Sequence, residues 1–343
     1  MRKILVTGSE GYIGSILMPL LITNGFTPVG LDVCYYSEAN ISKSFFPEYK
    51  LIIKDIRNFE LSDLINENYE AIIHLAALSN DPLGMLDENL TFNINFQATV
   101  RMGEIAKKAG IKRFIYSSSC SLYGLGSKQL LNEESPPYPQ TAYGKSKILA
   151  ENGLSELADN NFSPVFMRNA TAFGLSPRMR FDLVVNSLCG FAKIDNEIKI
   201  LGDGKPWRPL VHIHDIASAM INSLNQPKDK IHNQAFNVGS NSENYQILTI
   251  AEKVKERYPG CNISVAMKDA GDSRDYNVSF DKINKVLSFS VSRTLSDGIN
   301  ELADCFRKIN LDPEVFHNRL YNRLKQIQYL RDNNIINNFL IIT

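Results

Sequence analysis

Short apolar runs alternate with longer segments of helical periodicity along the first half of the chain. The apolar runs, which are typical of strands buried on both faces of a parallel sheet, are residues 4–6, 26–32, 51–53, 71–77 and 113–116. Apolar side chains recur at helical spacing over residues 13–21, 86–108 and 142–158. Strands that alternate with helices in this way predict an α/β fold built on a Rossmann-type doubly wound parallel sheet.

The alternation loosens after residue 177. We therefore expect residues 1–177 to form the Rossmann domain and residues 178–310 to form mainly a smaller, mixed α/β lobe, with some later segments returning to the first domain. Residues 311–343 are predicted to be a helical extension that packs onto the lobe or onto a partner subunit. Apolar side chains recur there at helical spacing, at Phe316, Leu320, Leu324, Ile327 and Leu330.

Three glycines separate the first predicted strand from the first predicted helix. Gly8, Gly11 and Gly14 would let the backbone approach a pyrophosphate, and the helix N-terminus would supply free N–H groups. An ordinary glycine-rich turn is the alternative, but Asp32 ends the next apolar run, where a carboxylate accepts hydrogen bonds from a ribose. That carboxylate repels a 2′-phosphate, and residues 33–36 contain no Arg or Lys. The pattern favours NAD over NADP.

Composition excludes several classes of function. Lys plus Arg and Asp plus Glu each number 37 among 343 residues, and no basic block indicates a nucleic-acid partner. We find no signal peptide and no apolar run that approaches the ~20 residues needed to span a membrane. The five cysteines are scattered without metal-ligand spacing, so we expect no metal and a reduced, cytoplasmic protein.

Tyr143 and Lys147 are four residues apart at the start of a predicted helix and therefore project from one face. An adjacent ammonium stabilises a phenolate, so we expect Lys147 to lower the pKa of Tyr143 from its reference value near 10. Ser119, at a strand end, would bond the same substrate oxygen as Tyr143 while a nicotinamide exchanges a hydride. A surface pair is the alternative for an isolated Tyr and Lys at this spacing, but the dinucleotide signature favours the catalytic interpretation.

These features resemble the extended short-chain dehydrogenase/reductases, and within them the NAD-dependent nucleotide-sugar epimerase/dehydratase family. The resemblance spans about residues 2–305. It rests on Thr-Gly-x-x-Gly-x-x-Gly at 7–14, Asp32, Asp55-Ile56, residues 74–77, residues 117–119, Tyr143 with Lys147, and Gly202-Asp203-Gly204 with Arg208.

The resemblance implies a role for individual residues. Ser119, Tyr143 and Lys147 would be catalytic. Residues implied to bind the cofactor are Gly8, Gly11, Tyr12, Ile13, Gly14, Asp32, Asp55, Ile56, Leu75, Ala76, Ala77, Asn95, Ser117, Tyr143 and Lys147. Residues expected to bind the nucleotide-sugar substrate are Ser79, Asn80, Ser119, Thr171, Arg208 and Arg274, the two arginines acting on its diphosphate.

Departures from the family pattern narrow the reaction. Sugar 4,6-dehydratases carry an acidic pair directly after the catalytic Ser or Thr, whereas this chain has Cys120 and Ser121, which argues against dehydration. Thr171 stands where 4-epimerases usually carry a substrate asparagine, and Pro209 stands where many family members have aspartate. An NAD-dependent epimerase or ketoreductase of a nucleotide-diphosphate sugar is expected. A non-catalytic NAD-binding regulator is the alternative, and the family implies a homodimer through the helices over 86–108 and 142–158.

Overall fold

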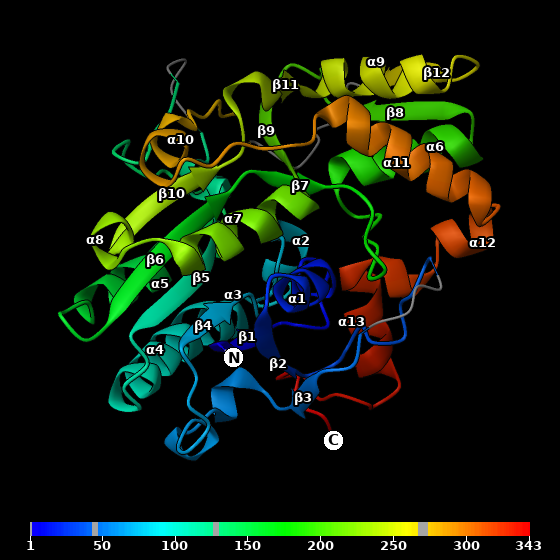
Figure 1. Ribbon diagram of the computed structural model, residues 1–343. Helices are drawn as coiled ribbons and strands as arrows, with labels where there is room; N and C mark the ends of the chain where they lie inside the picture. Colours follow the sequence, from blue (N-terminus) through cyan, green and yellow to red (C-terminus); the bar gives the residue numbers. More distant parts are fainter. Residues whose placement is uncertain (1, 43–46, 126–129, 267–273) are drawn as a thin grey trace.

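The computed structural model describes residues 2–42, 47–125, 130–266 and 274–343. Its centre is a seven-stranded, all-parallel sheet with the strand order β10-β6-β5-β4-β1-β2-β3 (Figure 1). The sheet confirms the predicted doubly wound fold. Strands β2 and β3 are added on one side of β1, and from β4 onwards the strands are added on the other side. The strands are β1 (Arg2–Thr7), β2 (Phe26–Asp32), β3 (Lys50–Ile53), β4 (Ala71–His74), β5 (Arg113–Ser119), β6 (Ser163–Asn169) and β10 (Gln234–Val238).

Helices cover both faces of this sheet, and alternate residues of β1 face each layer. Ile4 and Val6 belong to one buried cluster and Leu5 to another. The helices on the Ile4 face are α1 (Gly14–Thr23), α7 (Ile213–Asn225) and α10 (Asp281–Leu287). The helices on the Leu5 face are α4 (Ala98–Lys108) and α5 (Ala142–Glu156).

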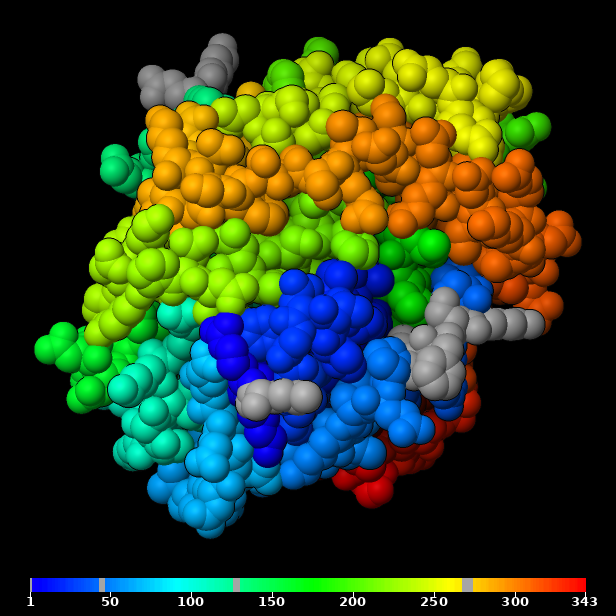
Figure 2. Space-filling view, viewed as in Figure 1, coloured from blue at the N-terminus to red at the C-terminus, as the bar shows by residue number. Residues whose placement is uncertain are grey.

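A smaller lobe lies beyond the carboxyl ends of the strands, along the top of Figures 1 and 2. It has a three-stranded sheet ordered β11-β9-β7 and a parallel pair, β12-β8. Its strands are β7 (Thr171–Phe173), β8 (Glu197–Leu201), β9 (Trp207–His212), β11 (Asn244–Gln246) and β12 (Asn262–Ala266). Its helices are α6 (Val184–Ile194), α9 (Ile247–Arg257) and α11 (Leu295–Lys308).

The short elements are one-turn helices at the ends of strands and loops. They are α2 (Asp81–Gly84), α8 (Lys228–Ile231), η1 (Ile56–Asn58), η2 (Leu61–Asp63), η4 (Cys120–Tyr123) and η5 (Asn241–Glu243). Within the described ranges, no helix is long and apolar enough to cross a membrane.

The helix predicted over residues 86–108 is interrupted. It comprises α3 (Glu88–Phe92), one π-helical turn, η3 (Asn93–Gln97), and α4. A π-helical turn shifts the side chains that follow it around the helix and is frequent near functional sites. Here it directs Asn95 inward, where the side chain is buried.

The C-terminal extension corrects the sequence prediction. It divides into α12 (Pro313–Phe316), η6 (Arg319–Tyr321) and α13 (Arg323–Asp332). Only the first part packs as expected, because Phe316 belongs to the core of the lobe. Helix α13 crosses to the Rossmann domain, where Ile327 and Leu330 pack with Leu78 and Leu83. The C-terminus therefore ends near β3, at the lower right of Figures 1 and 2.

Candidate active site

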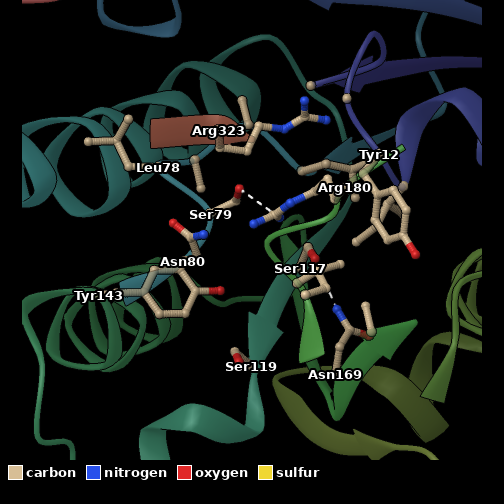
Figure 3. Close-up of a pocket in the computed structure, with 18 of the residues that line it drawn as sticks. Tyr12, Leu78, Ser79, Asn80, Ser117, Ser119, Tyr143, Asn169, Arg180 and Arg323 are labelled. Atoms are coloured by element: carbon tan, nitrogen blue, oxygen red, sulfur yellow. Dashed lines mark hydrogen bonds between the residues drawn. The ribbon is translucent and has the colours of Figure 1, made fainter. Parts of the chain in front are cut away.

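A cavity of about 530 Å³ lies between the carboxyl ends of the sheet strands and the small lobe. Ligands of doubly wound folds bind at this edge, beside the point where the strand order reverses. Every predicted site residue except Asn95 lines the cavity, so segments separated by more than 200 positions in the sequence converge there. Figure 3 shows side chains from several of these segments pointing into the same space.

The glycine turn leaves the first helix open to the cavity. Gly8 has a φ of +72°, and a Cβ atom on Gly14 would lie 2.4 Å from the carbonyl oxygens of Gly8 and Ser9. Any side chain at these positions would therefore displace the backbone. Among the described residues, no side chain caps the first turn of α1. The Ser15 and Ile16 N–H groups already donate to the Gly11 (3.0 Å) and Ile13 (3.1 Å) carbonyls, so a pyrophosphate would meet the helix N-terminus at the turn residues that precede them.

Asp32 lies at the end of β2 with its carboxylate held in place by the backbone. One oxygen accepts a hydrogen bond from the Glu10 N–H (3.0 Å) and the other from the Cys34 N–H (2.8 Å). Burial raises the pKa of this carboxyl group. The geometry suits a carboxylate that accepts hydrogen bonds from ribose hydroxyls, because each oxygen keeps a further lone pair.

Two of the predicted cofactor residues make different contacts from those expected. Asp55 lines the cavity, but both of its carboxylate oxygens accept hydrogen bonds from the Arg57 guanidinium. Asn95 is not part of the lining. Its side-chain amide accepts from the Leu78 N–H (2.8 Å) and donates to the Leu78 carbonyl (3.1 Å), and it also donates to Ser146. Asn95 therefore positions the loop after β4 instead of facing the cofactor space.

Ser119, Tyr143 and Lys147 form one wall of the cavity. Ser119 is the last residue of β5, and Tyr143 lies in the first turn of α5, which Thr141 caps through the Gly144 N–H (3.1 Å). Tyr143 and Ser119 project into the pocket in Figure 3. The buried ammonium of Lys147 donates to the Ser117 carbonyl (2.8 Å) and lies 5.6 Å from the centre of the Tyr143 ring.

The pKa of Tyr143 corrects the expectation from the sequence. Burial and, to a smaller extent, the carboxylate of Asp81 raise it to about 12, and a hydrogen bond with Ser119 acts in the opposite direction. The amine of Lys147, which donates to the Ser117 carbonyl, does not offset this rise. Burial also lowers the pKa of Lys147, to about 7. Two buried titratable groups with pKa values shifted towards their neutral forms are typical of a functional site.

A network across the cavity includes two residues that the sequence analysis missed. Arg180 makes a bidentate ion pair with Asp182 (2.9 and 3.0 Å) and donates to the Ser79 hydroxyl (3.1 Å), as Figure 3 shows. Asn80 donates to the same Asp182 carboxylate (2.9 Å). The predicted substrate residues Ser79 and Asn80 are thus coupled to the segment before α6. A signal was present, since two arginines alternate with apolar residues at 178 and 180.

The two predicted diphosphate-binding arginines meet at the lobe side of the cavity. Arg208 is buried and donates to the carbonyls of Trp207 (2.8 Å) and Arg274. Arg274 makes an ion pair with Asp81 (2.5 Å). Thr171, the first residue of β7, also lines this region. The structure therefore brings these side chains from separate segments into one place.

Cys120 packs in the core of the Rossmann domain. Its thiol is fully buried and donates towards the Arg168 carbonyl (3.1 Å). Burial raises the pKa of this thiol well above its usual value. Ser121 does line the cavity.

Comparisons with known proteins find relatives that share the sequence and the fold of this chain. A UDP-glucose 4-epimerase of Mycolicibacterium smegmatis is 27% identical over 320 residues, which covers 89% of this chain and 98% of the relative. A UDP-glucuronic acid 4-epimerase of Bacillus cereus, solved with UDP-glucuronic acid and NAD, has a TM-score of 0.76 at 25% identity and covers 90% of this chain and 100% of its own. A dTDP-glucose 4,6-dehydratase of Bacillus anthracis in complex with NAD has a TM-score of 0.76 at 20% identity, over 90% of this chain and 97% of its own.

A family profile settles the assignment at family level. It matches residues 4–239, which include the glycine turn, Asp32, the Ser119–Tyr143–Lys147 wall and Arg208. NAD is the cofactor of that family, in agreement with the prediction from Asp32. The chain belongs to the NAD-dependent epimerase/dehydratase family.

Proposed function

We propose that the protein is an NAD-dependent epimerase of a nucleotide-diphosphate sugar, which oxidises a ring carbinol to a ketone and reduces the ketone from its other face. The observation that carries this proposal is the convergence of Ser119, Tyr143 and Lys147 on a cavity that also contains the glycine turn and Asp32. A ketoreductase would use the same residues, and the experiment below separates the two.

The chain's own residues fit the cofactor. The glycine turn and the open N-terminus of α1 would hold the pyrophosphate, and Asp32 would hold the adenosine ribose. Lys147, within reach of the strand end at Ser117, would hold the other ribose. When bound, NAD supplies the hydride acceptor and donor.

Tyr143 would move the proton. When the carbinol is oxidised, its O–H proton would pass to the Tyr143 phenolate, and the phenol formed in this way would return the proton to the ketone oxygen on reduction. Ser119 donates a hydrogen bond to the same substrate oxygen. The raised pKa of Tyr143 keeps the phenol protonated and ready to donate, and the positive charge of Lys147 would stabilise the phenolate in the other direction.

The substrate diphosphate would take the place at which Arg274 now pairs with Asp81, with Arg208 beside it. A guanidinium binds two phosphate oxygens with parallel hydrogen bonds. Relatives named for UDP-glucose and UDP-glucuronic acid support a nucleotide sugar as the substrate.

The fold does not separate epimerases from dehydratases, because both occur among the similar structures. The side chains after Ser119 favour epimerisation. The thiol of Cys120 faces the core and Ser121 is no carboxylic acid, so neither would protonate a departing hydroxyl. Asp81, which faces Tyr143, is engaged by Arg274 and by Thr141 (2.5 Å).

The test is to incubate purified protein with NAD and a panel of nucleotide-linked hexoses, and to follow the sugars by NMR. Conversion of one hexose to its epimer without net NADH formation supports an epimerase. Stoichiometric NADH oxidation with 4-ketosugars would instead identify a ketoreductase. If neither reaction occurs across the panel, the non-catalytic regulator gains support and the role given to Tyr143 is contradicted.

Two further properties belong to this proposal. The five cysteines are unpaired and four of them are buried, which suits a reducing, cytoplasmic location. The adjacent helices α4 and α5 would form the interface of a homodimer, which light scattering of the purified protein would test.

A further inference from the structure

The C-terminal extension closes one end of the cavity. Leu340 and Arg323 line it, together with Tyr35, Tyr36 and Arg57 from the segments that follow β2 and β3. Side chains of the Rossmann domain hold the extension through hydrogen bonds to its backbone carbonyls. Arg57 donates to the carbonyls of residues 339 (2.7 Å) and 340 (3.2 Å), and the Tyr35 hydroxyl donates to the carbonyl of Leu340. The extension therefore forms the rim of the cavity beside Asp55 and Ile56.

Arg323 brings a buried cation into this rim. Only 2% of the residue is exposed, and its guanidinium lies 3.9 Å from the centre of the Tyr36 ring. One terminal nitrogen, Nη2, donates to the Arg178 carbonyl (3.2 Å). The other, Nη1, has no hydrogen-bond partner among the described residues. In Figure 3 the side chain extends from α13 towards the side of the pocket where Tyr12 lies.

The surroundings of Arg323 do not neutralise it fully. Burial and the like charge of Arg180 lower the pKa of Arg323, to about 10, and the carboxylates of Asp182 and Asp32 act in the opposite direction. Asp182 is already engaged by Arg180, and Asp32 accepts hydrogen bonds from two backbone N–H groups. A buried arginine with an unused donor is costly unless an anion completes its hydrogen bonds. The cavity beside it is the space from which such an anion would come.

We propose that Arg323 binds the pyrophosphate of NAD from the side opposite the glycine turn, so that the C-terminal extension is a second wall of the dinucleotide site. Arg323 lines the same cavity as Asp32 and the glycine turn, and its side chain extends towards Tyr12 of that turn, where the pyrophosphate would lie. The inference deepens the proposed function. An epimerase regenerates NAD within each turnover and gains from a cofactor held on both sides.

The test compares Arg323→Met with Lys325→Met by calorimetric titration of NAD, ADP and adenosine. Both variants remove one cation from α13, but Lys325 is exposed. We expect Arg323→Met to weaken NAD and ADP about 10- to 100-fold, the range for losing a hydrogen bond to a charged group. Adenosine, which has no phosphate, should bind both variants equally. Lys325→Met should leave all three affinities within about twofold.

Two outcomes would overturn the inference. The first is unchanged NAD affinity in Arg323→Met, and the second is an equal loss for adenosine, which would indicate altered folding. Thermal unfolding without cofactor controls for folding, and the variant should match the parent within a few degrees. Failure of the proposed function would look different, because NAD would bind normally while no sugar turned over.

Discussion

Two parts of one cavity are built in different ways. The wall of Ser119, Tyr143 and Lys147 comes from the neighbouring elements β5 and α5, and its side chains are set by a strand end and a four-residue spacing. The rim of Arg57, Arg323 and the C-terminal residues joins groups up to 283 positions apart. The wall is therefore assigned to chemistry, and the rim to holding the cofactor. The following substitutions test whether the two regions have these separate roles.

The largest effect is expected for Tyr143→Phe, which removes the proton-transferring oxygen from the wall. Turnover should fall about 10²- to 10⁴-fold, the range for a general acid–base group. NAD affinity should stay within about threefold, because the ring and its packing remain. Steady-state rates and NAD titration measure both effects. Tyr138→Phe, at a tyrosine that is 63% exposed, is the matched control. Retained turnover in Tyr143→Phe would contradict the assignment of the wall.

Lys147→Met should lower turnover about 100-fold by removing the charge that stabilises the phenolate. It also has a pH signature. The pKa of Lys147 is about 7 in the folded protein and about 10.5 when unfolded. Between these values the unfolded chain binds a proton that the folded protein does not, so this residue makes stability rise with pH. Below pH 7 the folded protein carries the full cost of a buried charge.

Lys147→Met removes that cost. The difference between the melting temperatures of the variant and the parent should therefore be more favourable to the variant at pH 6 than at pH 9. The hydrogen bond lost at the Ser117 carbonyl affects both pH values alike. Lys145→Met, an exposed lysine on the same helix, should show no such difference. A larger relative gain at pH 9 would show that Lys147 is not the source of the pH dependence.

Arg208→Ala tests whether substrate binding is separate from cofactor binding. The KM for the nucleotide sugar should rise about 10- to 100-fold, because a charge-assisted contact with the diphosphate is lost. NAD affinity should not change, since Arg208 lies at the lobe side of the cavity. A parallel loss of NAD affinity would show that the two binding regions are not separate. Initial rates over a range of substrate concentrations give the KM.

The smallest effect is expected at the rim for Arg57→Ala. It removes the hydrogen bonds to the carbonyls of residues 339 and 340 and the ion pair with Asp55. We expect NAD to bind about 2- to 10-fold more weakly, with kcat unchanged. A fall in kcat at saturating NAD would show that the rim also contributes to the chemistry. Arg101→Ala, which loses a hydrogen bond to the Arg57 carbonyl and leaves the Arg57 side chain in place, is the control.

The sequence was sufficient to predict the sheet and the wall because their signals are local. Apolar runs mark the strands, and the glycine turn, Asp32 and the Tyr143–Lys147 spacing each depend on a few neighbouring residues. Parallel strands then bring their carboxyl ends to one edge, which explains why distant loops meet at the cavity.

The parts that sequence analysis missed depend on long-range packing. The apolar pattern of residues 311–330 indicated a buried face but not its partner, so the crossing of α13 to the Rossmann domain was not foreseen. The sequence around Arg323 does not show that the fold buries it, and the alternation at residues 178 and 180 does not identify Asp182 as the partner of Arg180. Likewise, the pKa of Tyr143 was given the wrong direction because spacing shows a nearby ammonium but not the loss of solvent.

The most direct test of the central proposal is to follow the carbon-bound hydrogen. A nucleotide-hexose that carries deuterium at the reacting carbon would be incubated with the NAD-loaded protein in ordinary water. Transfer of this hydrogen as a hydride, out and back within one active site, should give an epimer that keeps its deuterium, with no conversion in Tyr143→Phe. An epimer that has lost its deuterium to water would contradict hydride transfer and, with it, the function given to Ser119, Tyr143 and Lys147.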